Sequence, residues 1–317
     1  MANTMILTLV LLAVIQTAMC NNCSRPCYPS EFFPNVQNNL TKIIWAHAVN
    51  SLMELDKALA SKDVMMLEGD VVMGRHTTSN VTDYIPIMAH PPATESDLSL
   101  EEFLMINNNN GSKGIKLDFK SNEAFNYSKI ILKKFQQFLK CPIILNADIL
   151  AGPVNATAPL VGVDFLKEAS YILPNSTISI GWTTRYGKEF NITEGRYSEN
   201  QIKEMVKIVT DSGINLPITY PVRAVFAVNN TDSMKELLKN TTSTGGATLT
   251  IWSSEGDYVD AANLSKLIKE VGLNKVYVDV PTDLRNQLNL SGASTMTSTI
   301  MINLIASLTL LVMSRML

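Results

Sequence analysis

The chain is short of several residue types, and each shortage excludes a class of protein. Only 4 of its 317 residues are cysteines, too few for a disulfide scaffold, and no Cys-x-x-Cys motif faces a second one to hold a structural zinc ion. Its 13 prolines and 15 glycines form no low-complexity linker or fibrous repeat. A formal net charge of -3 gives no reason to expect a nucleic-acid partner. Hydrophobic residues make up 46% of the chain, which suits one or two globular domains.

Residues 1–20 predict a secretory signal peptide. An apolar stretch from Met5 to Ile15 is followed by small and polar residues, with cleavage expected after Ala18 or Cys20. A membrane anchor is the alternative, but this stretch is shorter than the roughly 20 residues that a helix needs to span a bilayer.

Residues 289–317 predict a membrane attachment at the other end. An apolar tail from Thr299 to Leu317 follows a polar spacer and a cluster of small residues. This order is typical of a glycosylphosphatidylinositol (GPI) attachment signal. Because the spacer is shorter than the roughly 8 to 12 residues usual there, a single transmembrane helix remains the alternative. The candidate attachment residues are Ser291, Gly292 and Ala293.

Asn-x-Ser/Thr sequons are frequent and also predict secretion, because glycans need exposed loops of a secreted protein. In an oxidising compartment Cys23, Cys27 and Cys141 are disulfide candidates, and so is Cys20 if processing retains it. We therefore expect an extracellular glycoprotein at the cell surface or secreted from it. The twelve candidate glycosylation sites are Asn22, Asn39, Asn80, Asn110, Asn126, Asn155, Asn175, Asn191, Asn229, Asn240, Asn263 and Asn289.

Between the ends, short β-rich runs alternate with amphipathic helical stretches. Eight strand candidates that alternate with helices in about 240 residues predict a closed (β/α)8 TIM barrel over residues 42–288, preceded by an N-terminal strap at 21–41. An open doubly wound sheet is the alternative, but the segment WAHAVNS lacks the glycine-rich phosphate turn of such folds. An extra apolar run at 85–90 predicts a strand-like excursion above the barrel. The predicted strands are 43–49, 65–71, 115–120, 143–149, 178–184, 218–228, 248–254 and 276–280, and the predicted helices are 51–61, 98–106, 127–140, 164–173, 198–213, 233–240 and 264–272.

The unusual polar and aromatic residues fall at the C-terminal ends of these strands, where barrel enzymes carry out their chemistry. We expect phosphate or substrate contacts there from Asn50, Asn146 and Asp148, and positive charge for a phosphate from Lys120 and Arg223. Trp182 and Trp252 are candidates to pack against an apolar or sugar portion of a ligand, with a position in the core as the alternative for each.

Three carboxylates predict a metal site. Glu68 and Asp70 have i, i+2 spacing, so both point into the barrel mouth, and Asp118 does so from the next strand. Such acids repel one another unless a cation compensates them, and carboxylates with water suit one Mg2+ or Ca2+ ion. Salt bridges to Lys116, Lys120 and Arg223 are the alternative.

Two of the three histidines, His47 and His90, lie at the same end of the predicted strands. Histidine can accept and donate protons near neutral pH, so one is a candidate base and the other a candidate acid. His76 lies in a polar loop with a sequon, and we expect it to be solvated.

Several strings together resemble the menorin family, in family order, over roughly residues 42–280. That family is similar in turn to the phospholipase C-like phosphodiesterase barrels, which include glycerophosphodiester phosphodiesterases and spider sphingomyelinase D enzymes. The strings are WAHAVNS, LEGDV, PIMAHPP, LSLEEFL, GIKLDFKS, LNADIL, IGWTT and TYPVRA.

The resemblance implies roles for particular residues. His47 and His90 match the acid-base pair, Lys120 matches the phosphate-contacting lysine, and Glu68, Asp70 and Asp118 match the metal ligands. One departure is that the phosphodiesterases usually have His-Arg-Gly where this chain has His47-Ala48-Val49, so Asn50, Lys120 or Arg223 would contact the phosphate instead.

Two functions follow from these observations. The first is cleavage of a phospholipid or other phosphodiester by a neighbouring substrate hydroxyl, with a cyclic phosphate product. The second is a non-catalytic binding module, because menorins are known chiefly as surface or secreted factors that act with adhesion proteins in shaping neurites. A fold does not decide between them.

Overall fold

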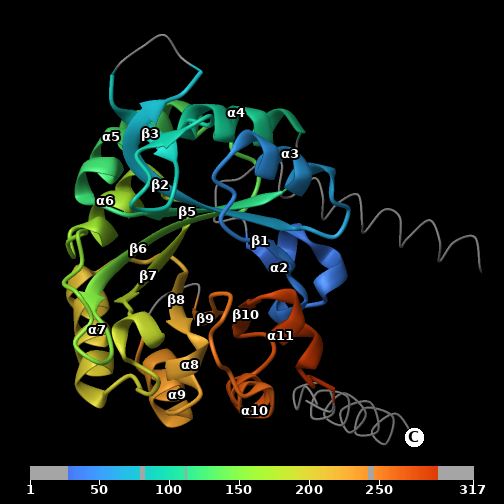
Figure 1. Ribbon diagram of the computed structural model, residues 1–317, viewed down its shortest axis with the longest axis vertical. Helices are drawn as coiled ribbons and strands as arrows, with labels where there is room; N and C mark the ends of the chain where they lie inside the picture. Colours follow the sequence, from blue (N-terminus) through green and yellow to red (C-terminus); the bar gives the residue numbers. More distant parts are fainter. Residues whose placement is uncertain (1–27, 79–82, 111–112, 242–245, 292–317) are drawn as a thin grey trace, which may run out of the picture.

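A computed structural model describes residues 28–78, 83–110, 113–241 and 246–291 of the chain. Eight parallel strands curve into a barrel, with the helices around the outside of it (Figure 1). The predicted (β/α)8 fold is confirmed, and each of the eight predicted strand segments contains a strand. These strands are, in order around the sheet, β1 (Trp45–Ala46), β2 (Met66–His76), β5 (Gly114–Phe119), β6 (Ile143–Ala151), β7 (Thr177–Thr183), β8 (Ile218–Arg223), β9 (Ala247–Trp252) and β10 (Val276–Asp279).

Three of the helices that cover the barrel begin at a capping serine. The hydroxyls of Ser51, Ser121 and Ser198 each accept a hydrogen bond from an amide in the first turn that follows. The cap at Ser121 explains why the helix predicted at 127–140 begins earlier. The helices are α3 (Leu52–Ala60), α4 (Leu100–Asn110), α5 (Asn122–Phe135), α6 (Phe165–Ile172), α7 (Glu199–Ser212), α8 (Ala224–Ala227), α9 (Thr231–Asn240), α10 (Ala261–Val271) and α11 (Thr282–Gln287).

The segment predicted as one strand at 218–228 divides in two. Strand β8 ends at Arg223, and the short helix α8 continues the chain. All the residues of α8 are buried, so its apolar run reads like a strand although it is a helical turn.

The barrel has a seam between its first and last strands. In the described part of the chain, no backbone ladder joins β1 to β10. Side chains close the seam instead: Trp45 and Tyr277 pack edge to face with ring centroids 6.0 Å apart. The Arg285 guanidinium donates hydrogen bonds to carbonyl oxygens on both sides of the seam, at Thr41 and Val278.

Strand β2 extends well beyond the barrel, over eleven residues. Its outer part pairs antiparallel with β3 (Ile85–Met88), and its last two residues pair with β4 (Glu95–Ser96). The apolar run at 85–90 therefore contains a strand, as predicted.

The prediction that His76 is solvated is wrong. Because β4 and α4 cover the end of β2, the residue is 8% exposed, and its Nε2 lies 2.7 Å from Oε2 of Glu102. This contact joins β2 to α4.

The segment before β1 closes the N-terminal end of the barrel. It contains α2 (Pro29–Phe32) and two 3-10 turns, Pro34–Val36 and Leu40–Lys42. Val36, Leu40 and Ile43 pack there in a small apolar cluster with Met66 and Ile144 from inside the barrel. The polar site consequently lies toward the opposite end.

The predicted signal peptide at 1–20 and the apolar tail from Thr299 lie outside the described residues. Among the residues that are described, no helix has the length and apolar character to cross a membrane.

Candidate functional site

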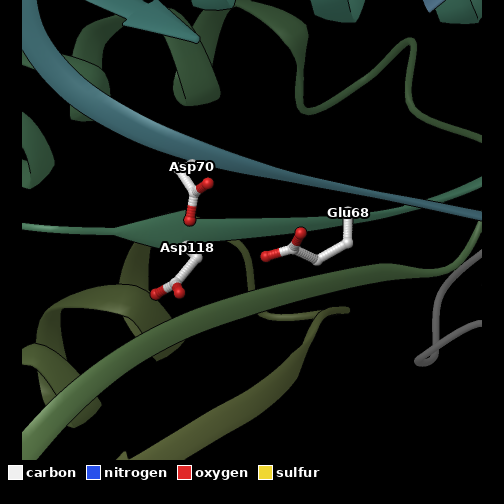
Figure 2. Close-up of side chains that lie close together, drawn as sticks. All are labelled: Glu68, Asp70 and Asp118. Atoms are coloured by element: carbon white, nitrogen blue, oxygen red, sulfur yellow. The ribbon is translucent and has the colours of Figure 1, made fainter. Parts of the chain in front are cut away.

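Three carboxylates meet inside the barrel, as the strand alternation predicted. Glu68 and Asp70 project from β2, and Asp118 projects from β5, where it is the register partner of Asp70 (Figure 2). One oxygen from each can be chosen so that all lie within 4.8 Å of one another. Glu68 is 2% exposed and Asp70 is 4% exposed, so the cluster is largely withdrawn from solvent.

The donor set fits a hard divalent cation. It offers only carboxylate oxygens, and opposite ligands lie about 5 Å apart around Ca2+ and about 4 Å apart around Mg2+. Oxygens that all lie within 4.8 Å of one another are compatible with either ion.

The charge around the cluster points the same way. Five acids interact at this end of the barrel, against Lys116, Lys120 and at most one histidinium. The acids outnumber these cations even when Arg285, which interacts with Asp279, is included, so the cluster favours a bound cation. The acids are Glu68, Asp70, Asp118, Asp148 and Asp279.

Two lysines already pair with these acids, as the salt-bridge alternative supposed. Lys120 Nζ lies 2.7 Å from Asp70 Oδ1 and 2.5 Å from Asp118 Oδ2. Lys116 Nζ lies 3.9 Å from Glu68 Oε1. Burial opposes the charged form of Lys120, but Asp118 and Asp70 outweigh it and hold its pKa well above the usual value.

Two asparagines orient the candidate metal ligands. The Asn50 amide donates to Asp70 Oδ2 at 2.8 Å and accepts from the Asp70 backbone N–H at 2.9 Å. Asn146 donates to Asp118 Oδ1 at 2.6 Å, and its oxygen accepts from Ser179. The structure thus gives both amides a carboxylate partner where we expected phosphate or substrate contacts. Such outer partners fix the ligands of metal sites.

His47 is held by a carboxylate that the sequence analysis missed. Its Nδ1 lies 2.9 Å from Asp279 Oδ2 and 3.7 Å from Glu68 Oε2. Burial alone would lower the pKa of His47, but Glu68 and Asp279 together raise it to about 9. With Nδ1 bound to Asp279, Nε2 is the nitrogen left for a substrate, and half of the side chain is exposed.

The residue after His47 adopts an unusual backbone conformation. Ala48 has φ of 56°, in the left-handed region that side chains other than glycine disfavour. This turn directs the Ala48 backbone N–H to Glu68 Oε2 at 2.9 Å. The strained residue therefore holds Glu68, one member of the acidic cluster, through its backbone. It occupies the position at which the phosphodiesterases named above usually carry an arginine.

His90 follows β3 and is exposed. Its Nδ1 lies 2.7 Å from the Pro91 carbonyl oxygen, while the preceding residue, Ala89, donates its backbone N–H to the Asp70 carbonyl oxygen at 3.0 Å. The backbone thus brings His90 beside the part of β2 that carries Asp70.

Asp148 is a half-buried carboxylate on β6. Burial, with the negative charge of Asp118 added, raises its pKa to about 6. A Cβ on Gly181 would lie 2.8 Å from Asp148 Oδ1, so the glycine leaves the room that this carboxylate occupies.

Arg223 has partners of its own rather than the clustered acids. Its guanidinium donates to both carboxylate oxygens of Asp257, at 2.9 and 2.7 Å, and lies between the rings of Tyr186 and Trp252. We expected it to contact phosphate, but this bidentate pair occupies its donors.

The two tryptophans lie in different places. Trp252 packs on Arg223 at the end of β9. Trp182 is 2% exposed and packs against Tyr197 and Tyr220. Because Ser179 faces the interior, strand alternation turns residue 182 to the outside of the sheet. The expected substrate contact at Trp182 is therefore corrected: this side chain belongs to the core.

Strand alternation could have found one of the missed residues, Asp279. In the last strand it lies two positions after inward-facing Tyr277. Asp257 gave no such signal, because it lies in a loop whose conformation alternation does not predict.

Nine of the predicted glycosylation asparagines are exposed and Asn39 is half-buried, while Asn22 and Asn80 lie outside the described residues. Ser291 is described, and Gly292 and Ala293 are not. Cys141 is half-buried, whereas Cys20, Cys23 and Cys27 lie beyond the described part. The nine exposed residues are Asn110, Asn126, Asn155, Asn175, Asn191, Asn229, Asn240, Asn263 and Asn289.

Several known proteins are similar to this chain. Among solved structures, a glycerophosphodiester phosphodiesterase from Parabacteroides distasonis covers 78% of this chain and 93% of its own at 15% identity, with a TM-score of 0.42. An L-ribulose 3-epimerase covers 80% of this chain and 86% of its own at 11% identity, also with a TM-score of 0.42. The human protein FAM151B is 34% identical over 241 residues, which are 75% of this chain and 82% of that protein. The family profile described as the Menorin N-terminal domain matches residues 39–285, and the chain accordingly belongs to the menorin family.

Proposed function

We propose that this menorin is a metal-dependent phosphodiesterase that cleaves a phospholipid or a glycerophosphodiester. One observation carries the proposal: the Glu68, Asp70 and Asp118 cluster lies beside the His47–Asp279 pair inside one end of the barrel. A metal-ligand set next to an oriented acid-base group is the combination that such cleavage needs.

The histidines would move the protons. Glu68 and Asp279 favour the charged form of His47, which suits it to give a proton to the leaving oxygen. His90 would take the proton from a neighbouring hydroxyl of the substrate as that oxygen attacks phosphorus. The new P–O bond closes a cyclic phosphate, and the bond to the leaving alcohol breaks.

Glu68, Asp70 and Asp118 would hold the Mg2+ or Ca2+ ion, which when bound supplies positive charge to polarise a phosphoryl oxygen. Asn50 and Asn146 would keep two of these carboxylates in place. Lys120, between Asp70 and Asp118, is the cation best placed to contact a phosphate beside them.

We further propose that the chain works outside the cell, as a secreted glycoprotein or one tethered to the membrane by its C-terminal segment. The exposure of nine sequon asparagines supports this proposal, because oligosaccharide transfer needs an accessible side chain. Release of the protein from cells by phosphatidylinositol-specific phospholipase C would support a GPI anchor, and retention would favour a transmembrane helix.

Phosphorus NMR tests the proposed cleavage. The purified protein is incubated with Mg2+ or Ca2+ and a panel of lysophospholipids, sphingomyelin and glycerophosphodiesters. We expect a cyclic or monoester phosphate signal that His47→Ala and His90→Ala proteins fail to produce. Thr250→Val, which alters a buried hydroxyl elsewhere in the barrel, is the matched control and should stay active.

A second candidate is a non-catalytic surface module that binds adhesion proteins. Two observations favour it. The Arg223 guanidinium is paired with Asp257, and Ala48 occupies the position at which the phosphodiesterases have a basic residue. A protein that binds the cation yet leaves every diester of the panel uncleaved would favour this candidate.

A further inference from the structure

A cavity of about 970 Å³ opens beside His47. It lies at the barrel seam, where β1 and β10 share no backbone ladder, and His47 and Asp279 stand in its wall. Its volume is at the upper end of the range for small-molecule sites, which runs to about 1,000 Å³. Its lining also includes Trp45, Lys57, Ser254, Glu255, Thr282 and Asp283.

The lining offers hydrogen-bond acceptors and donors together. Glu255 and Asp283 are exposed carboxylates, and within the described chain neither side chain has an ion-pair partner. Lys57 offers an ammonium group, which donates hydrogen bonds. Ser254 and Thr282 offer hydroxyls, which can both donate and accept hydrogen bonds. Trp45 adds a ring whose Nε1 is buried and has no acceptor among the described residues.

This mixture selects among ligand classes. An acyl chain would leave the polar groups unpaired, which is unfavourable. A second anion would meet the like charges of Glu255 and Asp283, and an ammonium group would meet the like charge of Lys57. A hydroxylated group satisfies both kinds, because each hydroxyl donates and accepts.

We propose that this cavity binds a polyhydroxylated group of sugar size, which forms one side of the phosphodiester whose phosphate lies next to His47. The inference rests on the proposed function for the position of the phosphate and adds the class of the adjoining group. A three-carbon polyol would fill little of a cavity of this volume. A lipid chain, where present, lies on the other side of the phosphate.

Binding of a matched pair of ligands tests this assignment without any turnover. Glucose 1-phosphate and cyclohexyl phosphate share a six-membered ring and a phosphate, and differ chiefly in the ring hydroxyls. Calorimetric titration of the full-length protein with each, in the presence of Ca2+, gives the two affinities. We expect glucose 1-phosphate to bind at least tenfold more tightly.

Two variants locate the preference. Glu255→Gln combined with Asp283→Asn keeps the shape of the lining but removes its charged acceptors, so the tenfold preference should fall to about twofold or less. Asp63→Asn combined with Glu204→Gln alters two exposed carboxylates that do not line the cavity, and this control should leave the preference intact. Equal melting temperatures of the two double variants show that folding is unaffected.

The outcomes separate this inference from the proposed function. Equal affinity for both esters, tighter binding of O-phosphoethanolamine, or no binding of any ester overturns the sugar-sized site, even if the NMR panel shows cleavage. The opposite result is also informative. If the unmutated protein prefers glucose 1-phosphate, the Glu255 and Asp283 variant loses that preference, and no diester is cleaved, the sugar-sized site is supported and the phosphodiesterase is overturned.

Discussion

The two halves of the barrel interior differ in chemistry although they share one fold. Strands β2, β5 and β6, with β10, direct Glu68, Lys116, Asp118 and Asp279 inward. Strands β7, β8 and β9 direct mainly neutral groups inward, among them the Thr219 and Thr250 hydroxyls, which bond to each other at 2.8 Å. Arg223, at the end of β8, is paired with Asp257. Both halves are covered by helices of the same kind (Figure 1).

The difference shows that the charged half of the interior departs from what folding of the barrel requires. Neutral hydroxyl pairs satisfy a barrel interior without excess charge, as the β7–β9 half demonstrates. The charged half instead accumulates acids whose burial is unfavourable and whose pKa values shift in consequence, as for Glu68 and Asp148. Such shifts gather at functional sites. The following predictions test this contrast.

The largest effect is expected for Asp279→Asn. The amide can hold the His47 ring but cannot favour its charged form, and loss of the comparable carboxylate in serine proteases costs about 10^4-fold in rate. We expect phosphodiester turnover to fall about 10^3-fold, with the affinity for Ca2+ changed much less. Initial rates and calorimetry check the two parts, and unchanged turnover would remove Asp279 from the mechanism.

Divalent cations should stabilise the protein through its charged half alone. A ligand at 100 times its Kd adds about 2.7 kcal/mol, which for a barrel of this size raises the Tm by about 5–10 °C. Glu68→Gln should lose this response, whereas Thr250→Val should keep it. Melting curves with Ca2+, Mg2+ and a chelator measure it, and identical curves for the unmutated protein would exclude the metal site.

Stability should depend on pH through His47. Its pKa rises from 6.5 to about 9 on folding, so the stabilisation is complete below pH 6.5 and disappears as the pH rises through 9. Because half of the side chain is exposed, we expect about 1 kcal/mol rather than the ~3 kcal/mol of the full shift.

Denaturant unfolding of the unmutated protein and of His47→Gln, both in chelator, isolates this contribution. The variant should be less stable at pH 6 and equally stable at pH 10. A difference that is the same at both pH values would contradict the ion-pair explanation.

The smallest effect is expected in the neutral half. Replacing both hydroxyls in a Thr219→Val, Thr250→Val protein leaves no partner unsatisfied, so the free energy of unfolding should change by less than about 1 kcal/mol. Cation stabilisation should be unchanged. A larger loss of stability, or a weaker stabilisation by the cation, would show that the two halves are coupled.

Much of the site could be predicted from the sequence, because strand alternation fixes which side chains face inward. It placed Glu68, Asp70 and Asp118 together, and applied to β10 and β7 it would also have found Asp279 and turned Trp182 outward. The covering of His76 depends on α4, and the Arg223–Asp257 pair depends on a loop, so neither follows from a local pattern.

The seam between β1 and β10 also makes the site dependent on the whole barrel. His47 and Asp279 are 232 residues apart in sequence, and Arg285 bonds to Thr41 across 244 residues. A chain still emerging from the ribosome, or one cut short before Asp279, carries the complete acidic cluster but lacks the partner of His47. Under the proposed function, truncated or unfinished copies are expected to be inert, so that turnover by a sample would report how much of it has been synthesised to its last strand.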